Sequence, residues 1–272
     1  MPLAVLTYHS HHVVGPGYEA NDHVALARDL DVLSDAGWRI VPLAEIVRLQ
    51  RHGTTAHLCA ITFDDGPVYD VDDVAHPAYG VQVGFLNAMR AFAARRPGAQ
   101  PSLHATSFVI ASPEARRAME SSADPRYTWL APGSMGEDWW PRALASGLVG
   151  IANHSWDHLH PALPAVAHSL DARGDFTQVM TLPDADAQVR RAARYLAQAT
   201  GGRASPYFAY PYGHHNVFLA RDYLPSVGAS VCVAAFTTEP RLVTTDDSPF
   251  LLPRLVCGAD WRSPDELIDR LV

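Results

Sequence analysis

Seven of the 14 histidines in this 272-residue chain are gathered into three short groups. The groups are His9, His11 and His12, then His154 and His158, then His214 and His215. Imidazole titrates near neutral pH and is the commonest metal ligand in proteins. This concentration of histidine therefore indicates a metal site, against the alternative of solvated surface residues.

Two adjacent carboxylates, Asp64 and Asp65, stand in a turn that ends in Gly and Pro. Neighbouring side chains cannot point the same way, so one can bind a metal ion while the other accepts a proton from a metal-bound water. A solvated acidic turn is the alternative. His154 and His158 have an i, i+4 spacing, which on a helical turn places both rings on one face, suited to chelating Zn²⁺. In a chain this rich in histidine such a pair also arises by chance.

Two further positions could take part in catalysis. His9 directly follows an apolar run, where it can face a site or be a satisfied core residue. Pro211 and Gly213 predict a tight turn that aims the N–H of Tyr212 at a substrate oxygen, as in an oxyanion hole. In isolation this segment is merely a turn. His11 and His12 are expected to be loop residues.

The elements that must position these residues alternate between short apolar runs and amphipathic segments. Leucines at helical spacing predict a helix that is capped by Asn21 or Asp22 and ends at Gly37. Further helices are predicted over 43–49 and 184–200. Strands are predicted over 3–8, 38–41, 58–63, 105–110, 149–152, 207–209, 230–235 and 251–255. Such alternation predicts parallel strands covered by helices, as a barrel or a doubly wound sheet.

The chemically interesting residues follow the ends of predicted strands. His9, Asp64 with Asp65, His154 and Tyr210 each come directly after one or within a residue of it. The carboxyl ends of parallel strands share one face, where sites are built. We therefore expect these side chains to converge. No linker divides the chain, so 1–272 is expected to be a single catalytic domain. The least regular stretches, 68–101 and 113–147, are expected to be long functional loops.

Composition excludes several other classes of protein. Lys and Arg number 21 against 29 Asp and Glu, a net charge of −8, which argues against a nucleic-acid partner. No apolar stretch is long enough to span a membrane. The 3 cysteines are widely spaced and favour neither a disulfide framework nor a cysteine zinc site. The first residues lack a signal-peptide pattern, so the chain as given is expected to be cytoplasmic, or secreted or periplasmic if a leader was removed.

Three strings stand in order along the chain: TFDDGP at 62–67, HSWDH at 154–158 and YPYG at 210–213. Together they resemble the polysaccharide deacetylase family (NodB homology, carbohydrate esterase 4), over about residues 1–258. The resemblance implies a distorted (β/α)₇ barrel with long inserted loops at its C-terminal face. It also implies metal-dependent removal of acetyl groups from sugars.

The resemblance assigns a role to each matching residue. The metal ligands would be Asp65, His154 and His158. The general base would be Asp64, and the N–H of Tyr212 would hold the oxyanion. The metal would be a divalent ion, with Zn²⁺ expected and Co²⁺, Ni²⁺ or Mn²⁺ as alternatives.

This chain departs from the family pattern in two of its motifs. The arginine that precedes the proline of the third motif is replaced by Ala209, and Arg254 is its candidate replacement or a structural arginine. The late Leu-x-His motif that supplies the catalytic acid is missing, since His215 is the last histidine. Thr7-Tyr8-His9 instead resembles the circularly permuted branch of poly-N-acetylglucosamine deacetylases. His9 is therefore the expected acid, and a barrel tolerates this permutation because its first and last strands are neighbours.

The interval from Asp65 to His154 is long for the family, and its loops are expected to rim the site. Trp139 and Trp140 would stack there on sugar rings, or pack in a helix. The residues expected to contact substrate are Trp139, Tyr210, Pro211, His214 and Arg254.

The expected activity is metal-dependent removal of N-acetyl or other N-acyl groups from an amino-sugar-containing substrate. Its partner would be an acetylated sugar or another N-acyl small molecule. One alternative is a deacylase or an amide or ureide hydrolase that acts on a small intracellular metabolite. A second alternative is an inactive carbohydrate-binding relative. The sequence leaves the oligomeric state open.

Overall fold

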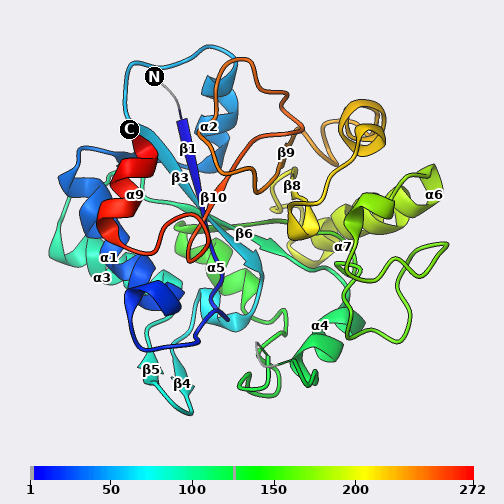
Figure 1. Ribbon diagram of the computed structural model, residues 1–272, viewed down its shortest axis with the longest axis horizontal. Helices are drawn as coiled ribbons and strands as arrows, with labels where there is room; N and C mark the ends of the chain where they lie inside the picture. The colour runs from blue at the N-terminus through cyan, green and yellow to red at the C-terminus, as the bar shows by residue number, and fades with distance from the viewer. Residues whose placement is uncertain (1–2, 125–126) are drawn as a thin grey trace.

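A curled parallel sheet forms the centre of the molecule (Figure 1). The computed structural model describes residues 3–124 and 127–272. Within them, the order of the 8-stranded sheet is β10-β1-β3-β6-β7-β8-β9, with β2 paired to β3. The strands are β1 (Leu3–Tyr8), β2 (Arg39–Ile40), β3 (Leu58–Asp65), β6 (Ala105–Val109), β7 (Val149–Asn153), β8 (Tyr207–Ala209), β9 (Ala234–Phe236) and β10 (Leu255–Val256).

The two edges of the sheet approach each other through the segment that precedes β10. Phe236 of β9 forms a parallel bridge to Leu252, and β10, three residues on, pairs in parallel with β1. The sheet therefore curls towards closure, and the first and last strands are neighbours. This confirms the (β/α) barrel architecture that the sequence predicted.

Helices cover the outside of this sheet (Figure 1). On one flank α1 (Asp22–Asp35) packs against α3 (Phe85–Arg95) and α9 (Pro264–Leu271), while α5 (Trp140–Ser146) and α7 (Arg191–Ala199) pack on β7. The other helices are α2 (Leu43–Gln50), α4 (Pro113–Glu120), α6 (Leu182–Ala185) and α8 (Leu224–Ser226). Shorter helical turns are η1 (Tyr18–Ala20), η2 (Val68–Asp70), η3 (Phe176–Gln178), η4 (Asp186–Arg190), η5 (Pro211–Gly213) and η6 (Phe218–Tyr223).

The first helix forms for the reasons that its sequence indicates. The Asn21 side chain accepts hydrogen bonds from the backbone N–H groups of His23 and Val24, which satisfies donors that the helix itself cannot. Leu26 and Leu30 then bury one face of α1 against the sheet. The predicted helix over 184–200 is also present, as the continuous run of α6, η4 and α7, with a π-helical turn in its middle.

The side chains of β1 alternate between the inside and the outside of the barrel. Leu3 and Val5 belong to an inner cluster, whereas Leu6 and Tyr8 pack under the outer helices. Thr7 continues the inner row, with its hydroxyl 3.0 Å from that of Thr62 on β3. Because strand side chains alternate with a period of two, the next inner positions at the strand ends are His9 and Asp64.

The prediction that 68–101 and 113–147 are long loops is wrong. They contain α3, α4 and α5 and an antiparallel hairpin of β4 (Val74–His76) and β5 (Gly80–Gln82). Gly84 and Trp139 are the residues directly before α3 and α5, and neither provides a capping side chain. Their starts therefore leave little trace in the sequence. The hairpin and α4 lie at the end of the barrel where β1 finishes (Figure 1), which is where insertions were expected.

Two late strands are shorter than predicted. The run 230–235 begins as a turn, in which Val231 and Cys232 both donate to the carbonyl of Gly228, so β9 starts only at Ala234. Of the predicted strand over 251–255, only Leu255 lies in β10.

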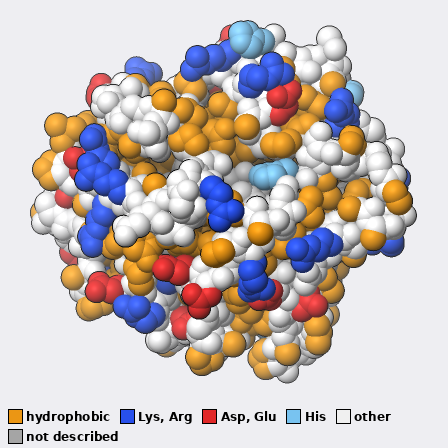
Figure 2. Space-filling view, turned by 180° about the vertical axis from the view of Figure 1, so that it is seen from behind, with side chains coloured by type: hydrophobic (Ala, Val, Ile, Leu, Met, Phe, Trp, Pro, Cys, Tyr) orange, Lys and Arg blue, Asp and Glu red, His pale blue; other side chains and the backbone are white. Residues whose placement is uncertain are grey.

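Acidic and basic side chains are interspersed on the face seen in Figure 2, without a continuous basic surface. Within residues 3–124 and 127–272, no helix combines the length and the apolar character that crossing a membrane requires.

One buried carboxylate ties four parts of the fold together. Asp29 of α1 accepts hydrogen bonds from the hydroxyls of Tyr8 (2.9 Å) and Tyr18 (2.5 Å) and from the indole N–H of Trp261 (3.2 Å). Burial raises the pKa of Asp29 to about 7, although the three donors act in the opposite direction.

This raised pKa predicts a pH-dependent stability. The folded state holds a proton on Asp29 that the unfolded state loses near its ordinary pKa, so the free energy of unfolding falls as pH rises from about 4 to about 7. The slope due to this one group is at most about 1.4 kcal/mol per pH unit. Denaturant unfolding of wild type and Asp29→Asn across this range measures it, and the variant should show the shallower slope. Equal slopes would contradict the prediction.

Candidate active site and metal centre

Asp64 and Asp65 end β3 and diverge because the backbone turns between them. Asp64 keeps the inward direction of the strand, while Asp65 adopts a left-handed conformation with φ of 72°. Gly66 follows with φ of 76°, and a Cβ atom there would lie 2.6 Å from Cγ1 of Val109 on β6. The Gly of the string at 62–67 is therefore needed to fold this turn against β6. The turn gives the two carboxylates separate surroundings.

Asp65 meets both histidines of the second string. Its Oδ1 lies 3.5 Å from Nε2 of His154 and 3.5 Å from Nε2 of His158. One ligand atom from each of the three residues lies within 4.8 Å of the others, and all three residues are buried. Ligands about 2.0–2.1 Å from a tetrahedral Zn²⁺ are about 3.3 Å apart, so these contacts have the spacing of a metal site.

The donor chemistry of this trio also fits a divalent metal. Nδ1 of His154 lies 2.9 Å from the Ala209 carbonyl, which can only accept, so Nδ1 carries the proton and Nε2 presents its lone pair to the trio. Oδ1 of Asp65 is buried without a hydrogen-bond partner among the described residues. A carboxylate with two imidazoles leaves a coordination position for water, as in catalytic zinc sites.

Burial acts in opposite directions on the pKa values of His158 and Asp65. It lowers the pKa of His158 well below the ordinary value, so that ring is neutral, as metal binding requires. Burial alone would raise the pKa of Asp65, but His158, His11 and His154 together hold it below its usual range. Asp65 is therefore ionised.

The segment 154–158 is not a helical turn, contrary to the sequence prediction. Ser155 and His158 have positive φ angles of 71° and 61°. The N–H of Ser155 donates to Oδ1 of Asn153, and that of His158 donates to Oγ of Ser155. These local bonds stabilise an irregular loop after β7. The loop brings the ring centroids of His154 and His158 to 4.8 Å from each other.

Asp64 is held by a buried arginine. Nη1 and Nη2 of Arg254 donate to its two oxygens at 2.7 Å each, and Nε of Arg254 donates to the Thr237 carbonyl at 3.1 Å. Burial alone would raise the pKa of Asp64, but Arg254 and then His154 hold it below its ordinary value. Arg254 is 0% exposed. It is the ion-pair partner of Asp64, and its contact with substrate stays a prediction.

A short loop after β1 brings two histidines to this carboxylate pair. His9 is partly exposed, and its backbone N–H donates to Oδ2 of Asp22 at 2.7 Å. His11 is buried, with Nε2 3.7 Å from Oδ2 of Asp65. His11, expected to be a loop residue, was not predicted to lie beside these carboxylates. The i, i+2 spacing of His9 and His11 after a strand was the available signal, because alternation directs such a pair to one side.

The third string forms a wall beside the metal trio. Tyr212 has a φ of 60°, and its ring centroid lies 4.3 Å from that of His158. A Cβ atom at Gly213 would lie 1.9 Å from Oγ1 of Thr238, so only glycine fits there. His214 is half-buried, 5.4 Å from Tyr212 between ring centroids.

Three of the residues expected to contact substrate are buried instead. Tyr210 packs in the core and donates its hydroxyl to the Phe250 carbonyl at 2.9 Å. Pro211 is buried in the same turn. Trp139 is 1% exposed within the outer core cluster, so its ring has no free face for a sugar, and the same holds for Trp140. Both positions match the alternative in which the tryptophans pack with a helix, because Trp140 begins α5 and Trp139 directly precedes it.

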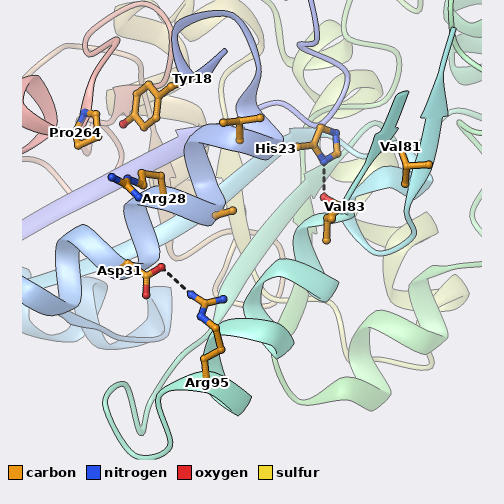
Figure 3. Close-up of a pocket in the computed structure, with 10 residues that line it drawn as sticks. Tyr18, His23, Arg28, Asp31, Val81, Val83, Arg95 and Pro264 are labelled. Atoms are coloured by element: carbon orange, nitrogen blue, oxygen red, sulfur yellow. Dashed lines mark hydrogen bonds and ion pairs between the residues drawn. The ribbon is translucent and has the colours of Figure 1, made fainter. Parts of the chain in front are cut away.

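A groove of about 780 Å³ lies on the outer side of α1, apart from the metal trio. Tyr18, His23, Val81 and Pro264 are among its lining residues (Figure 3).

The sequence model described as polysaccharide deacetylase matches residues 99–228, slightly less than half of the chain. This confirms the family resemblance that the three strings indicated. The matched range contains the strings at 154–158 and 210–213 but not the carboxylate pair. No curated protein matches the chain.

Several solved structures share the fold over nearly the full length of both chains. The deacetylase PplD of Streptococcus pyogenes, solved in complex with acetate, is 16% identical, with a TM-score of 0.63 over 100% of this chain and 99% of that one. IcaB from Ammonifex degensii is 20% identical, with a TM-score of 0.64 over 99% and 97%. The de-N-acetylase from Aggregatibacter actinomycetemcomitans is 15% identical, with a TM-score of 0.60 over 100% of both chains. At these identities the likeness is one of fold.

The buried pair of Asp64 and Arg254 predicts a large effect of removing one partner. Arg254→Met leaves an uncompensated buried carboxylate and should lower the free energy of unfolding by about 3–5 kcal/mol, as measured by chemical denaturation. The matched control is Arg142→Met, which removes a similarly bidentate but exposed pair with Asp72 and should cost no more than about 1 kcal/mol. Equal losses in the two variants would rule out the buried pair as the source.

Proposed function

We propose that this chain removes N-acetyl or other N-acyl groups from an amino-sugar-containing substrate by hydrolysis, with the help of a divalent metal. The match of residues 99–228 to the polysaccharide deacetylase family supports this proposal. The observation that carries the proposal is the trio of Asp65, His154 and His158 next to a separate carboxylate, Asp64. One carboxylate is available to bind a metal while the other moves protons.

Asp65, His154 and His158 would hold the metal, with Zn²⁺ as the first candidate and Co²⁺, Ni²⁺ or Mn²⁺ as alternatives. When bound, the metal supplies Lewis-acid activation of water and of the acyl oxygen. The protein residues provide its ligands and the groups that transfer protons.

Asp64 is the proposed general base. Its Oδ2 lies 3.8 Å from Nε2 of His154, so this carboxylate borders the metal trio without belonging to it. The pair with Arg254 keeps Asp64 ionised and fixes its orientation. It can therefore accept a proton from the attacking water.

His9 is the proposed general acid. It follows the inner row of β1, next to the position of Asp64 on β3, and its side chain is partly open to solvent. A protonated imidazole there can donate to the nitrogen of the leaving amine as the C–N bond breaks. The backbone N–H of Tyr212, whose ring lies beside that of His158, is the proposed donor to the developing oxyanion.

Removal of the metal should abolish the activity. Acetate release from an N-acetylated chitooligosaccharide should disappear after dialysis against a chelator and return when Zn²⁺, Co²⁺, Ni²⁺ or Mn²⁺ is added back. Activity that survives complete metal removal would contradict the proposal. The same assay with small N-acyl compounds and with ureides separates a sugar substrate from a small metabolite.

The two proton-transfer roles predict different substrate dependence. Asp64→Asn should lower kcat by about 10²–10⁴-fold on every acylated substrate, since water activation is always required. His9→Ala should do so only on N-acetyl sugars, because an activated ester such as 4-nitrophenyl acetate has a leaving group that needs no proton. Steady-state kinetics on both substrates measure this. Loss of ester hydrolysis in His9→Ala equal to the loss of amide hydrolysis would overturn the acid assignment.

A further inference from the structure

The loop that follows β1 is fixed at three of its first four residues. His9 donates its N–H to Asp22, and the ring of His12 bonds the other oxygen of Asp22 at 2.7 Å. The hydroxyl of Ser10 donates to buried Asp70 at 2.6 Å. These contacts make the loop a rigid support rather than a mobile rim.

The carbonyl of Ser10 is also held, by the ring of His23 from α1. Nε2 of His23 lies 2.7 Å from that carbonyl, and Nδ1 lies 2.7 Å from the carbonyl of Val83, the contact drawn in Figure 3. The loop is thus bound to α1 and to the segment after β5. His11, in the middle of this support, cannot move away without breaking several buried bonds.

His11 lies near Oδ2 of Asp65, the oxygen that His154 and His158 do not face. His154 and His158 both face Oδ1, whereas Nε2 of His11 lies 3.7 Å from Oδ2. The ring is 7% exposed and packs on Tyr127 at 5.2 Å between centroids. Its Nδ1 has no hydrogen-bond partner among the described residues.

These surroundings select one tautomer of His11. With the proton on Nε2, the N–H points towards the carboxylate, 3.7 Å away, which is longer than a hydrogen bond but close enough for electrostatic attraction. With the proton on Nδ1, a lone pair would face that negative charge and a buried N–H would lack an acceptor. Since a buried unpaired donor is costly, the Nε2–H form is favoured.

We infer that His11 is a positioning residue of the metal centre, whose Nε2 side faces Oδ2 of Asp65 and attracts it, so that Oδ1 faces His154 and His158. This inference rests on the proposed function. A carboxylate that is free to rotate would offer either oxygen to the metal, and an N–H held on the side of one oxygen disfavours that rotation. His11 is not itself part of the group whose ligand atoms lie within 4.8 Å of one another.

The test separates the donor of His11 from its packing. His11→Phe keeps an aromatic ring against Tyr127 and removes the N–H, while His11→Gln restores an amide N–H near the Nε2 position without the ring. Zn²⁺ affinity of the full chain is measured by competition with a chromophoric chelator, and folding of each metal-free variant by thermal unfolding. His11→Phe should bind Zn²⁺ about 10–100-fold more weakly, and His11→Gln should regain most of that loss.

His12→Gln is the matched control, because it alters the same loop at the contact with Asp22 rather than with Asp65. It should leave the Zn²⁺ affinity unchanged. A loss in His12→Gln equal to that in His11→Phe would overturn the inference, since loosening of the loop would then explain both. Unchanged affinity in His11→Phe would overturn it as well.

Absorption of the Co²⁺-loaded protein distinguishes a positioning residue from a ligand. The Co²⁺ spectrum of His11→Phe should keep the shape and intensity of the wild type. A spectrum that shows one imidazole ligand fewer would make His11 a ligand and overturn the inference. If the wild type binds no divalent metal, both the proposed function and the proposed role of His11 fail. If the wild type binds and His11→Phe binds equally well, only the role of His11 fails.

Discussion

Two adjacent carboxylates are buried at the end of one strand, and much of the surrounding structure compensates their charge. Asp64 is 3% and Asp65 6% exposed. Burial of unpaired charges is too costly for a folded protein to sustain, so each carboxylate needs its own partners. The left-handed turn at Asp65 makes this arrangement feasible, because it points the two side chains into different surroundings.

The partners of the two carboxylates differ in kind, and this difference separates their chemistry. Asp64 is paired with a permanent cation, Arg254, which contacts both of its oxygens. Asp65 faces imidazoles on both of its oxygens. An arginine cannot lose its proton or bind a metal, whereas neutral imidazoles can share a metal with the carboxylate. The same residue type is therefore a fixed anion at one position and a candidate metal ligand at the next.

The curled sheet explains how partners from distant parts of the chain meet. β3 lies beside β1, and β1 lies beside β10, so the end of β3 and the residues that follow β1 share one mouth of the barrel. Arg254, directly before β10, lies lower on the sheet, but its long side chain reaches up to Asp64, although position 209 on β8 is an alanine. Hydrogen bonds to Asp22, Asp70 and His23 then fix the loop that follows β1 at this mouth.

The sequence by itself determined the parallel barrel class, most of its strands, the first helix with its Asn21 cap, and the three residues that could hold a metal. Those features depend on local patterns: apolar runs, helical spacing, capping residues and short strings in a fixed order. The helices α3 and α5 lack capping side chains and escaped prediction, but so did α4, although Ser112 caps it. The irregular loop at 154–158 escaped prediction because its positive φ angles depend on bonds to Asn153 and Ser155.

Only the tertiary structure decided which way side chains face. Trp139 and Tyr210 proved to be core residues, and Arg254 and His11 proved to be partners of the carboxylates. The physical reason is that burial and pairing depend on neighbours from other strands and helices. A position in the sequence does not specify those neighbours until the sheet has closed around them.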